Sequence, residues 1–490
     1  MKTALILLAL ASSLHGQTKV VALPGKSPIV TIRIVFRTGA TADPKGKEGV
    51  ASLTASMLST GGTKSMSYKE VLDAFYPMAT GVSDYTDKEM MTFSASTHID
   101  NLEAFYKIFR TMLLEPGWRK EDFERNRDDQ MNYLTTSLRG NNDEELGKEV
   151  LYEDIYTQRP YGHTNAGTVS ALKSMTLDDL QNFYAKNLTQ ANLVIGIAGG
   201  YPSDFPSRIK KDFEKSLPKG KPSKEKLQAP MSLSATQIKL VEKNARSVAI
   251  SFGFPIDVRR GSPDFPALLL AQSYLGQHRS SGSHLFATMR GARGLNYGDY
   301  AYIEYFPQGM FRLEPQPNLA RQQQIFQVWI RPVEPPNAHF ALRLAVFELN
   351  KLIAEGIPEE EFERTKNFLS KYSTLLLKTK SAELGYAIDS AVYGTPRYDE
   401  YVRNSIAKLT RDEVTAAIRK HLHTNRLHIV VIGQNMKALH DKLVAETPSP
   451  ITYNSPKPQE LLDEDKVVAS WRIGAAADQV TVVPVEKIFE

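Results

Sequence analysis

The chain has 490 residues, more than a single hydrophobic core usually holds, so we expect two or more domains. It contains no cysteine, which excludes disulfide bonds, thiolate metal ligands and cysteine nucleophiles. The net charge of +5 arises from acidic and basic residues that are mostly interspersed. Because no nucleic-acid-binding motif accompanies this small excess of positive charge, we expect no nucleic-acid partner.

Residues 1–16 have the features of a secretory signal peptide. Lys2 provides a short positive region, residues 4–11 are apolar, and small and polar residues follow. The apolar stretch is too short to cross a bilayer as a stable helix, and no later run is long enough for a membrane span. We therefore expect export to the periplasm of a bacterium, with outright secretion as the alternative.

Strands and helices alternate along the first half of the chain. Residues 28–36 are rich in β-branched side chains with an alternating pattern, which is typical of a strand. A short helix is expected at 48–63, where Gly61 and Gly62 can end it, because glycine adopts the left-handed C-cap conformation without steric cost. The other elements expected here are strands at 90–99 and 191–198 and helices at 101–114, 120–138, 145–156 and 177–188.

The second half of the chain repeats the first. Thr176 begins a helix that leads to a strand ending at Gly199, and Thr410 begins a helix that leads, over the same interval, to a strand ending at Gly433. Threonine is a good N-cap, and acidic residues follow it in both copies. A Phe-Glu-Arg tripeptide upstream keeps the same order, at 123–125 and 362–364. We therefore predict an α+β fold of two tandem homologous domains, each an antiparallel-rich sheet with a layer of helices.

A segment rich in lysine, proline and glycine separates the two copies and is typical of a solvated linker. The expected organisation is an N-terminal domain at 18–215, a linker at 216–231, a C-terminal domain at 232–445 and a tail at 446–490. Within the tail, Val467–Trp471 and Val480–Val485 are expected to form short strands that dock on the second domain or on a partner.

The helix at 48–63 carries Ser52, Ala55 and Ser56 on one face, because positions i, i+3 and i+4 share a side of a helix. Small residues suit close packing, which is one interpretation of this face. The other interpretation is that these positions once carried catalytic chemistry and no longer do.

The two halves, the linker and a strand-turn-helix start with Gly39, Asp43, Gly46 and Gly49 together resemble the insulinase/pitrilysin-type peptidase family, over about residues 20–440. Active members of that family carry an H-x-x-E-H motif on this helix. Its two histidines bind zinc, its glutamate acts as the general base, and a glutamate further along the chain completes the metal site.

The resemblance places Ser52 and Ser56 at the two histidines and Ala55 at the catalytic glutamate. It places the third ligand near residues 138–142, which contain no carboxylate, although residues 143–145 are all acidic. Serine hydroxyls are poor zinc ligands and alanine cannot act as a base, so we expect no metal in this chain.

The ten histidines offer no substitute metal site. His421 and His423 are two positions apart and do not share a helix face, and a cation there suits the end of the helix dipole. His163 lies in a turn that the family also has, and we expect its role to be structural.

A second family feature is retained in the segment 285–297. Arg290 and Tyr297 keep the interval of an arginine and a tyrosine that, in the family, face the zinc across a closed cavity. The resemblance implies that this pair binds the substrate backbone and that the tyrosine helps to stabilise the oxyanion. The alternatives are that Arg290 caps a helix and Tyr297 packs on a strand, or that Arg293 is the functional arginine.

Together these features predict the zinc-free subunit of a heteromeric periplasmic metallopeptidase. A homologous H-x-x-E-H partner would bind the zinc in a heterodimer or heterotetramer, and this chain would supply Arg290 and Tyr297 for the cleavage of peptide substrates, with no activity of its own. The alternative is an inactive structural or peptide-binding scaffold of the same fold. An autonomous enzyme that uses another site is a third possibility, but the chain contains no G-x-S-x-G motif to support it.

Overall fold

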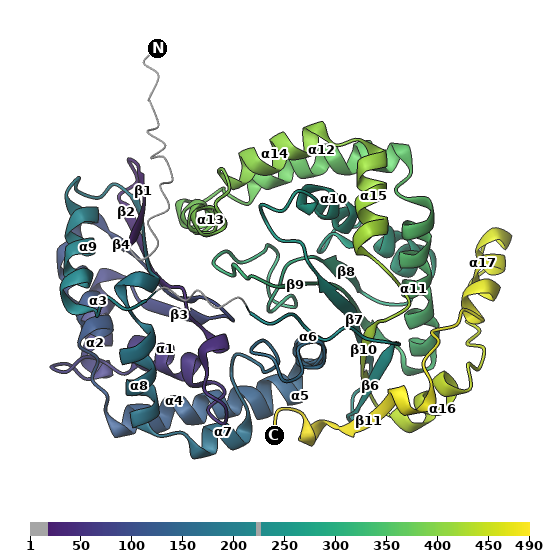
Figure 1. Cartoon of the computed structure of the whole chain (residues 1–490), viewed down its shortest axis with the longest axis horizontal. Helices are drawn as coiled ribbons and strands as arrows, with labels where there is room; N and C mark the ends of the chain where they lie inside the picture. Colours follow the sequence, from purple (N-terminus) through teal and green to yellow (C-terminus); the bar gives the residue numbers. More distant parts are fainter. Residues whose placement is uncertain (1–17, 222–226) are drawn as a thin grey trace, which may run out of the picture.

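The computed structural model describes residues 18–221 and 227–490 and consists of two halves side by side, each built on a sheet covered by helices (Figure 1). The predicted signal peptide at 1–16 lies outside the described residues. Part of the predicted linker, residues 222–226, also lies outside them.

The first half contains a five-stranded sheet in the order β1-β5-β2-β4-β3. β1 and β5 are parallel, and all other neighbours are antiparallel. Every residue of β5 is buried, which explains its continuous apolar sequence, because both faces of the strand are covered. The strands are β1 (Lys19–Pro24), β2 (Ile29–Phe36), β3 (Val82–Thr86), β4 (Met91–His98) and β5 (Leu193–Gly199).

The helices of the first half follow the expected order. α4 continues through a π-helical stretch, η4 (Tyr133–Leu138), toward α6. The helices are α1 (Val50–Thr60), α2 (Tyr68–Phe75), α3 (Leu102–Leu114), α4 (Lys120–Asn132), α5 (Arg139–Asn141), α6 (Asp143–Ile155), α7 (Val169–Ser174), α8 (Leu177–Asn187) and α9 (Phe205–Ser216). α1 ends where predicted, and Gly62 has the positive φ of 67° that favours glycine.

The second sheet has the order β11-β6-β10-β7-β9-β8. Without β11, its order and its pattern of parallel and antiparallel pairs are those of the first sheet. The predicted α+β fold of two homologous halves is therefore confirmed. The strands are β6 (Gln237–Glu242), β7 (Val248–Ile256), β8 (Gly298–Tyr302), β9 (Gln324–Val333), β10 (His428–Gly433) and β11 (Val480–Pro484).

The helices of the second half include α15, whose N-cap Thr410 forms the same kind of capping box as Thr176 at α8. A π-helical stretch, η6 (Phe286–Ala292), precedes β8. The helices are α10 (Phe265–Gly276), α11 (Ala338–Glu355), α12 (Glu359–Leu375), α13 (Lys380–Tyr393), α14 (Tyr398–Lys408), α15 (Arg411–His421), α16 (Met436–Val444) and α17 (Gln459–Ala469). Among the described residues, no helix is long and apolar enough to cross a membrane.

Each half contributes one helix to the sheet of the other half. α6 packs on β7 and β10 of the second sheet, whereas α13 packs on β1 and β5 of the first. Gly196 of β5 permits this approach, since a Cβ at that position would lie 2.6 Å from Cδ1 of Ile388 on α13. The two helices occupy equivalent places in the repeat, so the exchange is reciprocal and covers both sheets at the junction of the halves.

The tail contains one predicted strand that is confirmed and one that is wrong. Val480–Val485 contains β11, which pairs in parallel with β6. Val467–Trp471 is not a strand, because it overlaps the end of α17. The buried residues Asp465, Val468 and Ala469 follow the helical spacing i, i+3, i+4 rather than the alternation of a strand.

The end of the chain returns to the first half (Figure 1). Phe489 is 3% exposed within the core of that half. Its carbonyl oxygen accepts a hydrogen bond from the backbone amide of Val169 at 2.9 Å. The Glu490 carboxylate pairs with Arg139 at 3.2 Å. The tail therefore docks on both halves of its own chain.

The connection between β8 and β9 joins the halves through a buried ion pair. Arg321 in this connection donates through Nε to Asp87 of the first half at 2.8 Å, and neither side chain is exposed. The guanidinium also lies 3.7 Å from the ring centre of Tyr305. Removal of either partner would leave the other charge buried and uncompensated.

We expect Asp87→Asn to lower the free energy of unfolding by about 3–5 kcal/mol, because it leaves the Arg321 charge buried and uncompensated. Denaturant unfolding followed by tryptophan fluorescence measures this change. Asp73→Asn, which removes a partner from the exposed pair with Lys69, is the control and should leave the midpoint unchanged. A small effect of Asp87→Asn would show that the pair does not hold the halves together.

Candidate functional site

The face of α1 that carries Ser52, Ser56 and Thr60 opens into a cavity, here called the α1 cavity. All three residues are half-buried, whereas Ala55 is fully buried in the core and does not line the cavity. Opposite them lie the acidic and polar residues Asp84, Asn126, Asp129, Tyr133, Glu145 and Glu149. The structure therefore brings together the positions that the family resemblance assigns to the two histidines.

Two carboxylates of the α1 cavity, Asp84 and Glu145, already have partners from the protein. Asp84 accepts hydrogen bonds from the hydroxyls of Ser59, at 2.6 Å, and Ser56, at 3.5 Å. Burial raises the pKa of Asp84, which those hydrogen bonds oppose only in part. Glu145 pairs with Lys148 at 2.5 Å. Within residues 18–221 and 227–490, no three His, Asp or Glu side chains are arranged to hold a metal ion.

Residues 138–142, where we expect the third ligand from the family resemblance, do not line the α1 cavity. The residues of the long helix that line it are Asn126, Asp129, Gln130 and Tyr133. The π-helical stretch lies after them, and Leu138 is buried in the core. Glu145, one of the acidic residues that follow 138–142, does line the cavity.

Arg290 and Tyr297 lie shortly before β8, the last strand in the order of the second sheet. Neither residue lines the α1 cavity. The guanidinium of Arg290 is 4.6 Å from the ring centre of Tyr297 and 4.9 Å from that of Phe286. Tyr297 is 69% exposed, and its hydroxyl has no hydrogen-bond partner in the described part of the chain. The pair is therefore preorganised by a cation–π contact and open to a ligand or a partner.

Arg293, the alternative candidate for the functional arginine, already forms ion pairs with other residues of the chain. Its side chain is buried and forms ion pairs of 2.7 Å with both Glu464 and Asp465 of α17. These contacts fix the tail on the second half and leave no guanidinium edge for a substrate. Arg290 is thus the arginine of this segment that is available for binding.

A buried carboxylate lies beneath the Arg290–Tyr297 pair. Asp299 of β8 is completely buried, accepts a hydrogen bond from Asn296 through one oxygen, and has no partner for the other oxygen among the described residues. Burial raises the pKa of Asp299 to about 7, although the Asn296 hydrogen bond and the Arg290 charge both favour ionisation. This carboxyl group was not identified from the sequence, because a lone Asp in a short strand has no distinguishing pattern.

His163 and His421 pair with carboxylates in structural roles. His163 contacts Asp43 at 3.1 Å, and Asp43 accepts hydrogen bonds from the backbone amides of Gly49 and Ala51 at the start of α1. His421 pairs with Asp264 at 2.7 Å, so the charged end of its helix has a carboxylate partner. The Gly- and Asp-containing start of α1 is therefore a capping arrangement that fixes the helix.

Two homologous α+β halves with the same strand order, a separate Arg–Tyr pair, and an α1 cavity with no histidine among its described lining residues define this protein. Residues 20–169 match the sequence model of the insulinase family, peptidase family M16, and residues 174–369 match that of the peptidase M16 inactive domain. The chain belongs to the insulinase family and lacks its H-x-x-E-H motif.

The chain is similar over most of its length to several proteins and solved structures. A Helicobacter pylori protein described as the non-peptidase homolog YmxG is 21% identical over 428 residues, which is 84% of this chain and 90% of that protein. A crystal structure of a peptidase M16 inactive domain from Pseudomonas fluorescens superposes with a TM-score of 0.74 at 22% identity, covering 86% of this chain and 96% of that one. The periplasmic protease PqqL from Escherichia coli gives a TM-score of 0.65 at 15% identity, covering 86% of this chain and 45% of that one.

We expect Asp299→Asn to stabilise the protein in a pH-dependent way. The carboxyl has a pKa of about 7 in the folded protein and about 4 in the unfolded chain, so ionisation favours the unfolded chain. The free energy of unfolding is therefore highest below about pH 4, where the carboxyl is protonated in both states, and it falls as the pH rises from 4 through 7. The isosteric amide cannot ionise, so the variant should gain about 2–4 kcal/mol at pH 8 and nothing near pH 4. Thermal unfolding at the two pH values tests this, with the exposed Asp478→Asn as the control. An equal effect at both pH values would contradict it.

Two histidines restored on α1 should create a zinc site. Ser52 and Ser56 are one turn apart and line the same cavity, so their replacements can share one metal ion. We expect the variant with both Ser52→His and Ser56→His to bind Zn²⁺ about tenfold more tightly than either single variant, measured by competition with a chromophoric chelator. Equal affinity of the single and double variants would show that the two positions do not converge.

Proposed function

We propose that this protein is the zinc-free subunit of a heteromeric periplasmic metallopeptidase. The observation that carries the proposal is the separation of Arg290 and Tyr297 from the α1 cavity of their own chain, combined with the exposure of Tyr297. Because the pair does not line the α1 cavity of its own chain, we propose that it acts on a substrate bound at the zinc site of another chain. The partner would be a homologue with an intact H-x-x-E-H motif, in a heterodimer or heterotetramer.

In this proposal the chain contributes hydrogen-bond donors that stabilise the oxyanion and position the substrate. The zinc of the partner would polarise the scissile carbonyl and activate water. The Tyr297 hydroxyl would donate a hydrogen bond to the developing oxyanion, and the Arg290 guanidinium would bind a substrate carbonyl oxygen. Arg290 lies in η6 and Tyr297 directly before β8, and their cation–π contact keeps the two donors close together.

A groove along β3 supports peptide binding. β3 is the last strand of the first sheet and lines this β3 groove together with the loop at 311–318 of the second half. An extended peptide can add to such an edge through backbone hydrogen bonds. Phe311 and Leu313 are 72% and 67% exposed beside it and offer apolar contacts for side chains.

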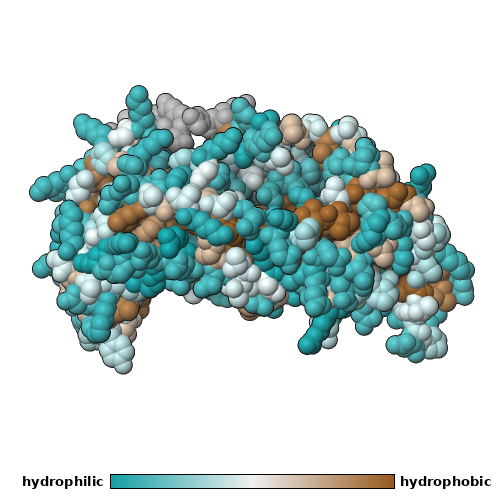
Figure 2. All heavy atoms as spheres, turned by 90° about the horizontal axis from the view of Figure 1, so that it is seen from below, coloured by the Kyte–Doolittle hydropathy of each residue, from teal (hydrophilic) through white to brown (hydrophobic). Residues whose placement is uncertain are grey.

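The scaffold hypothesis remains the alternative, and the β3 groove supports it as well, since a groove can hold a peptide without cleavage. Seen from below, the surface is mainly hydrophilic and its hydrophobic residues form separate patches (Figure 2). The expected periplasmic location is supported by the N-terminal sequence and by the structural similarity to a periplasmic protease.

The decisive experiment mixes this protein with an H-x-x-E-H homologue encoded beside its gene. We expect peptide cleavage that neither chain shows alone. Tyr297→Phe and Arg290→Ala should each lower kcat by about 100-fold with unchanged zinc content, because they remove groups that act on the oxyanion and the substrate.

The control is Tyr76→Phe, which alters a tyrosine that is 88% exposed in the first half and should leave cleavage unchanged. Cleavage that is insensitive to both Arg290→Ala and Tyr297→Phe would overturn the proposal. A stable complex with no cleavage under any condition would favour the scaffold.

A further inference from the structure

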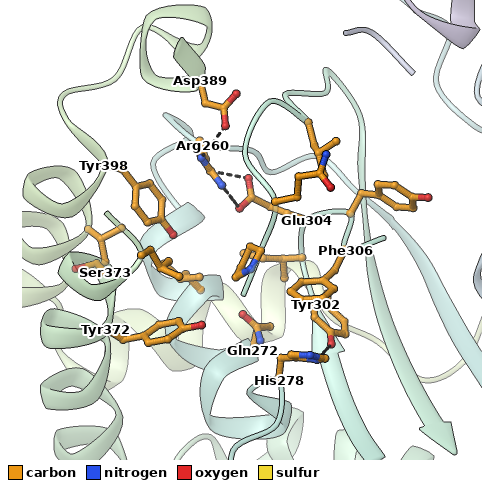
Figure 3. A pocket seen from close by; sticks show the side chains of 18 of the residues that line it. Arg260, Gln272, His278, Tyr302, Glu304, Phe306, Tyr372, Ser373, Asp389 and Tyr398 are labelled. Carbon is orange, nitrogen blue, oxygen red and sulfur yellow. Dashed lines mark hydrogen bonds and ion pairs between the residues drawn. The ribbon is translucent and has the colours of Figure 1, made fainter. Parts of the chain in front are cut away.

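The second half contains a pocket, here called the tyrosine pocket, at the place equivalent to the α1 cavity of the first half (Figure 3). The α1 cavity lies among α1, β3 and α4, and the tyrosine pocket lies among their counterparts α10, β8 and α12. Its walls include the apolar side chains Leu269, Ile303, Leu369 and Leu376. The repeat has therefore kept a cavity in both halves, with different linings.

Hydrogen-bonding groups point into the tyrosine pocket without a protein partner. Tyr398 is 7% exposed, yet its hydroxyl makes no hydrogen bond with any described residue, and it points toward the pocket in Figure 3. The Tyr372 hydroxyl is directed the same way. Gln272 donates through Nε2 to the Ala301 carbonyl at 2.8 Å, which leaves its acceptor oxygen for the pocket. These three groups line the pocket with unused hydrogen-bonding capacity, which a ligand can fill.

One end of the pocket is charged. Arg260 donates to Glu304 at 3.0 Å and lies 3.8 Å from Asp389, so one guanidinium lies beside two carboxylates. Burial raises the pKa of Asp389 to about 6, while Arg260 and the hydrogen bonds from Asn318 act in the opposite direction. His278 adds no positive charge, because burial lowers its pKa to about 4.

The aromatic rings around this end already hold one cation. The Arg260 guanidinium lies 4.6 Å from the ring centre of Tyr398 and 5.4 Å from that of Tyr386. On the far side, Tyr302 and Phe306 present further rings to the pocket (Figure 3). Aromatic faces and carboxylates attract the same class of ligand, a cation.

We propose that the tyrosine pocket binds a guanidinium or ammonium group carried on an apolar stem, as in an arginine or lysine side chain. The carboxylates, the Gln272 oxygen and the two tyrosine hydroxyls accept hydrogen bonds from a group that has only donors. The apolar walls contact the methylene stem. A bound cation would lie beside the carboxylates of Glu304 and Asp389.

We propose that the cation is a side chain of a peptide that binds in the β3 groove. Pro315, Gln316 and Leu376 border both spaces, so a side chain of a peptide in the groove can reach the pocket. This step rests on the proposed peptide groove. The cation site itself does not, because all of its groups belong to this chain and need no partner subunit.

The test uses the isolated mature chain at pH 8 and two matched ligands, N-acetyl-arginine amide and N-acetyl-citrulline amide. Citrulline has nearly the same shape as arginine but no charge. By isothermal titration we expect the arginine compound to bind at least about tenfold more tightly than citrulline, and Tyr398→Phe and Tyr372→Phe each to weaken it by about three- to tenfold. Glu304→Gln should weaken it by at least about tenfold. Tyr76→Phe is the control.

Equal affinity for arginine and citrulline compounds, or binding that survives Tyr398→Phe and Tyr372→Phe unchanged, would overturn the proposal. The two tyrosine variants keep the ring and remove only a hydroxyl, so they remain informative if Glu304→Gln fails to fold. An extended peptide with one arginine that binds more tightly than the free amide identifies a peptide source, and equal binding identifies a free amine. Because no zinc subunit is present, this result is independent of the cleavage experiment.

Discussion

The buried ion pair between Arg321 and Asp87 is the contact on which the arrangement of the two halves depends. Burial opposes ionisation of Asp87, but the Arg321 guanidinium holds the pKa of that carboxyl below its usual value. The two oxygens of Asp87 face two nitrogens of Arg321, which is the planar geometry in which a desolvated pair is most favourable. Because Arg321 belongs to the connection between β8 and β9, the pair fixes that whole connection on the first half.

Both binding spaces follow from this fixed connection. Its residues 311–318 lie across from β3 and form one wall of the β3 groove. Farther along, Asn318 donates through its backbone amide to Asp389 at 2.9 Å and through its side chain to the Gly385 carbonyl at 3.0 Å. The same contacts hold Asp389 at the charged end of the tyrosine pocket. Groove and pocket are thus built from one loop that is anchored at both halves.

The repeat was predictable because its signals are local. Thr176 and Thr410 cap helices that lead to buried strands, and such patterns need only neighbouring residues. The reciprocal packing of α6 and α13 was not predictable, since helical periodicity gives a buried face but does not say which sheet covers it. The same reason explains the missed tyrosine pocket, whose charged end joins Arg260, Glu304 and Asp389 from distant parts of the chain. The prediction for 467–471 failed because two valines suggested a strand where the buried positions follow a helix.

The α1 cavity and the Arg290–Tyr297 pair differ in whether the chain itself supplies hydrogen-bond partners for their polar groups. In the cavity, Asp84 accepts hydrogen bonds from serine hydroxyls, so the positions that face it are stable without any ligand. At the pair, an exposed tyrosine ring is held by an arginine and its hydroxyl contacts nothing in the described chain. Core packing explains the small residues on α1, whereas it does not explain an ordered aromatic–cation pair at the surface. The polar groups around Asp84 therefore have partners within the chain, whereas the Arg290–Tyr297 pair is left open to a second chain or a ligand.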